Sequence, residues 1–372
     1  MSGIKVGFSA GTEPPISRIE LALRLARVAG FDSLWTIDHF QSFFNRGIWQ
    51  RDFTWLATGR SPHAILDYQV VLGHLARKAG RVQIGVGVTE PIRRHPVQIA
   101  QTFMTLSHLL KKPPILGIGS GEAENTVPYG LDFKRPVSRL EEALQIIKLC
   151  FESDGTFDFH GDFYRMDAAV MDLRPAVGRT PEIWLASHGP RMLEMTGRFG
   201  DGWFPVVPMT PEDYGDRLAV IRKSAAEAGR DPEAIAAGLS LYLIAGRTEA
   251  EARKYLHHRS VRYLALLVPD YVWNKYGVTH PLGKGFQGMV DFVPESYTTD
   301  ELEQMMAEVP LDLLEEPAAF GTPEQLLDKL YQYRDAGLQH VVLQPVSGLV
   351  SRGAAAFALK TIVSLARKLR KG

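Results

Sequence analysis

Short apolar segments alternate with longer amphipathic ones along most of the chain, and this alternation restricts the fold more than any other feature. Eight segments read as strands, at 5–8, 33–37, 82–88, 114–119, 183–186, 202–205, 237–245 and 340–343. Helical spacing of apolar residues is clearest at 15–29, 62–79, 96–110, 136–151, 322–336 and 354–369. Such alternation indicates parallel strands covered by helices. Eight strands are enough to close a barrel, so we predict an α/β fold, a (β/α)8 TIM barrel, with residues 1–372 as one domain.

A doubly wound open sheet is the structural alternative. The glycine cluster at 117–122 follows a predicted strand, as a dinucleotide-binding turn would. Its sixth position, however, is Glu122, where the G-x-G-x-x-G pattern requires glycine or alanine. The sequence therefore disfavours the dinucleotide-binding version of an open sheet.

Two connections, at 40–61 and 268–320, are longer than a minimal barrel needs. Long loops in compact domains are usually functional or disordered. Both are rich in aromatic residues, which argues against disorder; the first contains Phe43, Phe44, Trp49, Phe53 and Trp55. We expect both insertions to fold over the C-terminal mouth of the barrel and to shape an apolar pocket there.

Charge and cysteine content exclude several classes of function. The 42 Lys and Arg residues balance 42 Asp and Glu residues, whereas nucleic-acid-binding proteins usually carry a basic field. Cys150 is the only cysteine, so neither an intramolecular disulfide nor a cysteine-rich metal site is expected. No apolar run approaches the length of a membrane span, and the first strand leaves no room for a signal peptide. We expect a cytoplasmic protein without nucleic-acid partners or integral membrane association.

Polar or glycine-rich segments follow four of the predicted strands, at 38–39, 87–90, 121–125 and 187–190. In barrels of this kind the active site forms from loops at the C-terminal ends of the strands. Any one segment alone is better explained as a strand or helix cap. Because all four share one end of the barrel, we predict an active site there.

Asp38, His39 and Glu122 are the candidate catalytic residues in these segments. A histidine beside a carboxylate can move a proton near neutral pH, but a histidine bonded to a backbone carbonyl explains the pattern as well. Glu122 on a glycine-rich turn can face a cavity, where desolvation would raise its pKa; alternatively, it is a helix N-terminal acid. The histidines form no H-x-x-x-H pattern or comparable cluster, so we expect no metal site.

In this order the segments resemble the F420-dependent branch of the bacterial-luciferase-like superfamily. The resemblance rests on residues 5–8, 36–40, 85–89, 116–122 and 200–203. A second set of segments, 182–193, 228–232 and 277–281, resembles the phthiodiolone dimycocerosate ketoreductases of mycobacteria. The resemblance implies an oxidoreductase that transfers hydride with the deazaflavin coenzyme F420, and it implies a homodimer.

The resemblance also implies roles for individual residues. Gly87 and Val88 would form a non-prolyl cis peptide behind the deazaflavin, and His39 and Glu122 would be the active-site histidine and acid. The cofactor would be bound by residues at the strand ends, namely Asp38, Gly87, Val88, Thr89, Asn125, Ala186, Ser187, His188 and Gly189. Four basic residues either attract the polyglutamyl tail of F420 or are ordinary solvated charges: Arg93, Arg94, Lys134 and Arg135.

Two departures from the family pattern bear on the substrate. Phe43 stands where the sugar-phosphate dehydrogenases of this branch have tryptophan, and the segment 203–208 lacks their phosphate-binding lysine. We therefore reject glucose 6-phosphate and expect a bulky apolar or lipid-like ketone or alcohol, in a pocket with Phe43, Trp49 and Trp203. Two other functions remain open, an FMN-dependent luciferase-like monooxygenase and a non-catalytic barrel that binds an apolar ligand.

Overall fold

Eight parallel strands close into a barrel in the computed structural model, which describes residues 3–315 and 318–370. The strands pair in the order β1-β2-β3-β4-β7-β8-β9-β11, and β11 pairs again with β1. This closure confirms the predicted TIM barrel and rules out the open sheet. The strands are β1 (Lys5–Ser9), β2 (Ser33–Thr36), β3 (Gln83–Thr89), β4 (Ile115–Ile118), β7 (Glu182–Leu185), β8 (Gly202–Trp203), β9 (Ala236–Ala245) and β11 (His340–Gln344).

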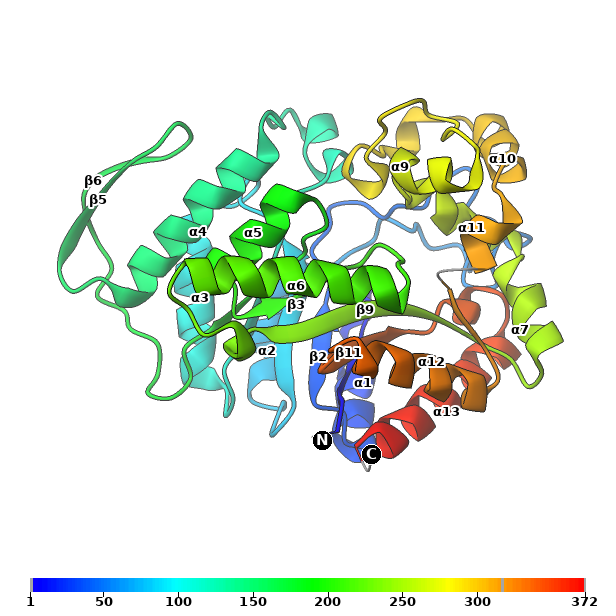
Figure 1. Ribbon diagram of the computed structural model, residues 1–372, viewed down its shortest axis with the longest axis horizontal. Coiled ribbons are helices and arrows are strands. Elements are labelled where there is room, and N and C mark those ends of the chain that lie inside the picture. The colour runs from blue at the N-terminus through cyan, green and yellow to red at the C-terminus, as the bar shows by residue number, and fades with distance from the viewer. Residues whose placement is uncertain (1–2, 316–317, 371–372) are drawn as a thin grey trace.

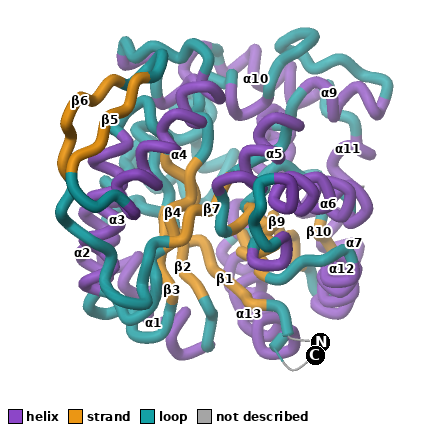
Figure 2. Tube along the Cα trace, turned by 60° about the vertical axis from the view of Figure 1, so that its left-hand side comes forward, coloured by secondary structure: helices purple, strands orange, loops and turns teal. Residues whose placement is uncertain are grey.

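Helices surround the strands, as Figures 1 and 2 show. Asp67 caps one of them by accepting hydrogen bonds from the backbone N–H groups of Gln69 and Val70, so this helix begins at Tyr68 and not at residue 62 as expected. The outer helices are α1 (Ile16–Ala29), α2 (Tyr68–Ala76), α3 (Pro96–Leu109), α4 (Pro136–Glu152), α5 (Pro190–Phe199), α6 (Pro211–Glu227), α12 (Pro323–Asp335) and α13 (Arg352–Leu369).

Large aromatic side chains fill the interior of the barrel. Trp35 stacks on Phe204 with 4.3 Å between ring centroids, and Trp184 meets Trp35 edge-on at 5.4 Å. Gly202 and Gly238 make room for this packing, because a Cβ atom at either position would lie within 2.5 Å of the Trp184 indole. The interior is therefore a packed core, and a ligand site has to form above it, at the strand ends.

The two insertions pack against each other in a second hydrophobic core beside the barrel. Phe44 and Phe53 of the first insertion contact Tyr263 with ring centroids 5.3 and 5.8 Å apart, and the Tyr263 hydroxyl donates to the carbonyl oxygen of Phe43. Tyr263 in turn meets Phe292 of the second insertion edge-on, with 6.2 Å between ring centroids. Short helices supply the rest of this core: α7 (Glu249–Leu256), α8 (Arg259–Arg262), α9 (Asp270–Trp273), α10 (Thr299–Ala307) and α11 (Leu311–Glu315). Residues 316–317 of the second insertion lie outside the described residues.

Two strand pairings were not expected from the sequence. The strands β5 (Thr156–His160) and β6 (Arg165–Val170) form an antiparallel hairpin that projects from the side of the barrel near α4 (Figure 1). A short strand, β10 (Ala319–Gly321), pairs with the last residues of β9, so that β9 extends past the closed barrel. Within the described ranges, no helix is both long and apolar enough to cross a membrane.

Candidate active site

A cavity of about 850 Å³ opens at the C-terminal ends of the barrel strands. Residues 269–291 of the second insertion form part of its wall, so this insertion does fold over the barrel mouth as expected. The strand ends contribute the floor and the remaining wall, including His39 after β2, Thr89 at the end of β3, Gly119 after β4, Ala186 after β7 and Gln344 at the end of β11.

His39 lies at this cavity in contact with two acidic side chains. Its Nδ1 atom lies 2.8 Å from Oε1 of Glu124 and 3.7 Å from Oε2 of Glu122. The Asn125 side-chain amide lies 2.9 Å from the same Nδ1 atom, and its carbonyl oxygen accepts from the backbone N–H of Phe40 at 2.7 Å. A 3-10 turn at Ala123–Asn125 presents these groups together. These contacts fix the orientation of the His39 ring, so that Nδ1 faces the protein.

Burial changes the acidity of both glutamates. Desolvation raises the pKa of Glu122 to about 7, although His39 and Arg93 oppose the rise. The Glu124 side chain has no exposed surface, and burial raises its pKa well above the usual range. Its Oε2 atom is buried without a hydrogen-bond partner among the described residues. Burial therefore favours the protonated form of Glu124, and Glu122 can gain or lose a proton near pH 7.

The same three side chains have the spacing of a small metal site. Ligand atoms of His39, Glu122 and Glu124 all lie within 4.8 Å of one another, a juxtaposition that the sequence patterns did not reveal. Metal ligands have to be deprotonated to bind. Because the pKa values of both carboxyl groups are raised, protons compete strongly with a cation at this cluster.

Asp38 points away from His39 into a buried ion cluster. Its Oδ2 atom accepts from the Thr89 hydroxyl at 2.7 Å and lies 2.8 Å from Arg94 and 3.0 Å from Arg93. Only 3% of the Asp38 side chain is exposed. The carboxyl group that contacts His39 is therefore Glu124 and not the neighbouring Asp38. Arg93 and Arg94 are ion-paired below the surface, which corrects the reading of them as solvated charges.

The sequence profile of luciferase-like monooxygenases matches residues 3–340, which is most of the barrel and both of the glutamates at the site. The chain belongs to the luciferase-like monooxygenase family. Its relatives within this family include a phthiodiolone/phenolphthiodiolone dimycocerosates ketoreductase from Mycobacterium bovis, 36% identical over 351 residues that cover 92% of each chain.

Another family relative is an F420-dependent glucose-6-phosphate dehydrogenase from Amycolatopsis mediterranei, 30% identical and covering 91% of this chain and 92% of the relative. Among solved structures, an F420-dependent secondary alcohol dehydrogenase in complex with an F420-acetone adduct superposes with a TM-score of 0.76. The superposition covers 98% of both chains at 22% identity, and it supports the shared fold.

Most of the expected cofactor-binding residues of this luciferase-like protein line the cavity. The peptide bond between Gly87 and Val88 is cis, which is the conformation that the resemblance implies. Ser187 lies apart from the cavity: it is fully buried, and its hydroxyl lies 2.8 Å from the Thr196 hydroxyl. The set that lines the cavity comprises Asp38, Gly87, Val88, Thr89, Asn125, Ala186, His188 and Gly189.

The expected substrate pocket is only partly correct. Phe43 lines the cavity and meets His39 edge-on, with 4.9 Å between ring centroids. Trp203 is fully buried, stacks on Tyr214 and donates from Nε1 to the carbonyl oxygen of Ser187. Trp49 packs beside Phe44 in the second hydrophobic core. Both tryptophans therefore stabilise the fold around the cavity instead of lining it.

Glu124 is the site residue that sequence reasoning missed. It lies in the polar, glycine-rich segment 121–125, between Glu122 and Asn125. A signal was present, because three polar residues within four positions cannot all be buried without partners. The partner, His39, lies 85 positions away, so the sequence alone did not connect them.

Proposed function

We propose that this protein is an F420-dependent oxidoreductase that interconverts a bulky apolar or lipid-like ketone and its alcohol. Two relatives of high coverage support the proposal, one named a ketoreductase and the other an F420-dependent dehydrogenase. The observation that carries it is the pair of His39 and Glu122 on the cavity wall, 3.7 Å apart. Together they offer a proton donor and a proton store at neutral pH.

The residues around the cavity fit a planar, anionic cofactor such as F420. The Nδ1 atom of His188 is buried at the cavity without a partner in the described part of the chain, and burial lowers the pKa of this histidine to about 3. A neutral imidazole of this kind is ready to bond a ligand. Gly189 precedes helix α5, whose first turn offers free amides for a phosphate group.

Each protein group then has a distinct task in ketone reduction. When bound, reduced F420 supplies a hydride for the carbonyl carbon. His39 is positioned through Nδ1, so we assign Nε2 to the carbonyl oxygen, where it donates the proton that completes the alcohol. Glu122, with its pKa near 7, would accept the proton that the ring nitrogen of reduced F420 gives up when the hydride leaves. In alcohol oxidation the same groups move protons in the opposite direction.

The walls of the cavity favour an apolar substrate. Val206 and Val207 line it in the segment where a sugar-phosphate enzyme would carry its lysine. Phe43 adds an aromatic face beside His39. This segment therefore offers no cation to a phosphate group on the substrate.

Binding of F420 and FMN to the purified protein tests the proposal. We expect micromolar or tighter binding of F420 in fluorescence quenching, no comparable binding of FMN, and oxidation of reduced F420 by long-chain ketones. Preference for FMN, with oxygen consumption, would assign the protein to the monooxygenases instead. Binding of apolar ligands without any turnover would assign it to the non-catalytic barrels.

We also propose that the chain works as one domain, as a homodimer and in the cytoplasm. The resemblance to F420-dependent enzymes of this family supports the dimer. Light scattering during gel filtration tests it, and a mass equal to that of one chain would contradict it.

A further inference from the structure

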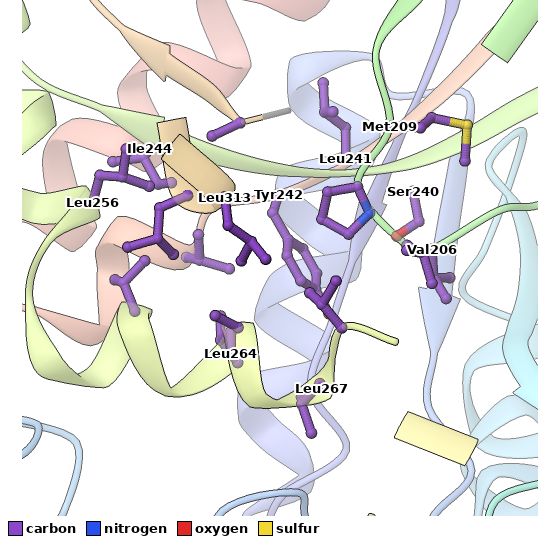
Figure 3. Close-up of a pocket in the computed structure, with 18 of the residues that line it drawn as sticks. Val206, Met209, Ser240, Leu241, Tyr242, Ile244, Leu256, Leu264, Leu267 and Leu313 are labelled. Atoms are coloured by element: carbon purple, nitrogen blue, oxygen red, sulfur yellow. The ribbon is translucent and has the colours of Figure 1, made fainter. Parts of the chain in front are cut away.

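A second, smaller pocket adjoins the active-site cavity. It has a volume of about 70 Å³ and lies between β9, the segment 256–268 and helix α11. The two spaces share four lining residues, Val206, Val207, Tyr242 and Met289. In Figure 3, Tyr242 stands between two groups of lining residues, with Leu256, Leu264 and Leu313 on one side and Val206 and Ser240 on the other.

Almost all of the side chains that line the small pocket are apolar. Three of the lining side chains carry polar atoms: Ser240, Tyr242 and Tyr333. The Ser240 hydroxyl accepts from the Gln344 amide, and the Tyr333 hydroxyl donates to the carbonyl oxygen of Met209. A polar ligand group in this pocket would find few hydrogen-bond partners, whereas an apolar group has no hydrogen bonds with water to lose. The pocket therefore selects an apolar occupant.

Tyr242 marks the junction between this pocket and the reacting groups. It lines both spaces, and its phenol is close enough to Glu122 for the carboxylate to help raise the pKa of Tyr242 to about 12, although burial is the larger cause. A ligand held near Glu122 and His39 can thus extend past Tyr242 into the pocket. An empty apolar cavity of about 150 Å³ holds one benzene ring, so a space of about 70 Å³ suits a short alkyl chain.

We infer that this pocket binds a short alkyl arm of the ketone or alcohol, while the rest of the substrate leaves through the barrel mouth. The inference rests on the proposed function for the identity of the reacting group. Beyond that function, the inference states that the enzyme binds the two substituents of the carbonyl carbon in different environments. One arm is short and enclosed by Leu256, Leu264 and Leu313, and the other is unrestricted in length.

A series of methyl ketones from acetone to 2-hexanone tests the inference kinetically. Burial of a methylene group gains about fourfold in binding, so kcat/KM should rise by about that factor per carbon until the pocket is full. Leu264→Phe fills the pocket and should lower the ratio of kcat/KM for 2-hexanone over acetone by about tenfold or more. Leu311→Phe is the matched control, because Leu311 is half exposed on α11, and it should leave this ratio unchanged.

Crystals of the full chain soaked with 6-bromo-2-hexanone give a readout that is independent of activity. We expect the anomalous bromine peak among Leu256, Leu264 and Leu313. A bromine at the mouth near Tyr271, or no ordered bromine, would overturn the inference even if ketones are reduced. A bromine in the pocket of a protein that turns over no ketone with F420 would overturn the proposed function and leave the alkyl site standing.

Discussion

Nδ1 of His39 lies 2.8 Å from Oε1 of Glu124, a carboxyl group with no exposed surface. The two residues belong to different strand-end loops, one after β2 and the other after β4. Burial raises the pKa of Glu124 well above its usual range, and the contact orients the imidazole ring. A histidine held in this way presents its other ring nitrogen to a ligand in a defined direction.

Replacement of His39 by alanine removes the proposed proton donor. We expect turnover to fall by about 100-fold or more, with the affinity for F420 largely retained because His39 faces the substrate. Stopped-flow oxidation of reduced F420 and fluorescence titration measure the two quantities. His160→Ala, on the exposed β5–β6 hairpin, serves as the control. An unchanged turnover number for His39→Ala would remove His39 from the mechanism.

The raised pKa of Glu122 predicts how stability depends on pH. In the unfolded chain this carboxyl group loses its proton near pH 4.5, and in the folded protein near pH 7. Between these values the folded state binds more protons, so the contribution of Glu122 to stability is fully present below about 4.5 and is lost as the pH rises through about 7. Glu122→Gln should remove this loss and stabilise the protein at pH 8, by on the order of 3 kcal/mol.

Urea denaturation of both proteins at pH 5 and pH 8 measures this difference. Glu141→Gln is the control, since Glu141 pairs with Arg191 and Arg198 at the surface. Equal pH dependence of wild type and Glu122→Gln would show that Glu122 titrates normally. In kinetics, any apparent pKa near 7 that belongs to Glu122 should also disappear in the glutamine variant.

Two substitutions of Glu124 distinguish a neutral acid from a buried charge. Glu124→Gln keeps the shape and an oxygen for His39, so we expect a melting temperature close to wild type and a loss in kcat below about tenfold. Glu124→Ala leaves the His39 Nδ1 contact unmade and should destabilise the fold by about 1–3 kcal/mol. If both variants lower kcat and stability equally, Glu124 is instead the charged partner of His39. Affinity for F420 should remain unchanged in both.

The Asp38 carboxylate forms ion pairs with Arg93 and Arg94, so its replacement should lower the stability of the fold. Asp38→Asn leaves Arg93 and Arg94 with less compensation for their buried charges, and breaking such a cluster typically costs about 3–5 kcal/mol. Thermal unfolding measures the loss. Asp167→Asn, in the exposed ion pair with Arg165, should leave the melting temperature unchanged. A small effect of Asp38→Asn would mean that water replaces the carboxylate in the cluster.

The barrel was predictable because its strands are buried on both faces. Strands such as β2 and β4 are buried at every residue, which produces short uninterrupted apolar runs between the helices. The hairpin of β5 and β6 was missed for the opposite reason. Every other residue of β5 is exposed and the rest are only half buried, so its sequence lacks the apolar run of a barrel strand.

The site was predictable at the level of loops and less so at the level of side-chain directions. His39 and Glu122 do face the cavity, as expected from their positions at strand ends. Successive residues of an extended segment point to opposite sides, which is why Asp38 turns to Arg93 and Arg94 while His39 turns to Glu124. Trp203 likewise follows a buried strand pattern, but its indole packs on Tyr214 in the core. The direction in which each of these side chains points depends on contact residues that are distant in the sequence.

Strand β9, which runs from the closed barrel to its pairing with β10, gives the enzyme a scale for the length of an alkyl arm. Five of its residues line the small pocket, namely Leu239, Ser240, Leu241, Tyr242 and Ile244, and a strand advances about 3.3 Å per residue. The length of an alkyl arm bound in the pocket therefore corresponds to a position along β9. New chain-length preferences can evolve by exchanging leucines on α11 or in 256–268, while the closed barrel and its proton-handling residues stay as they are.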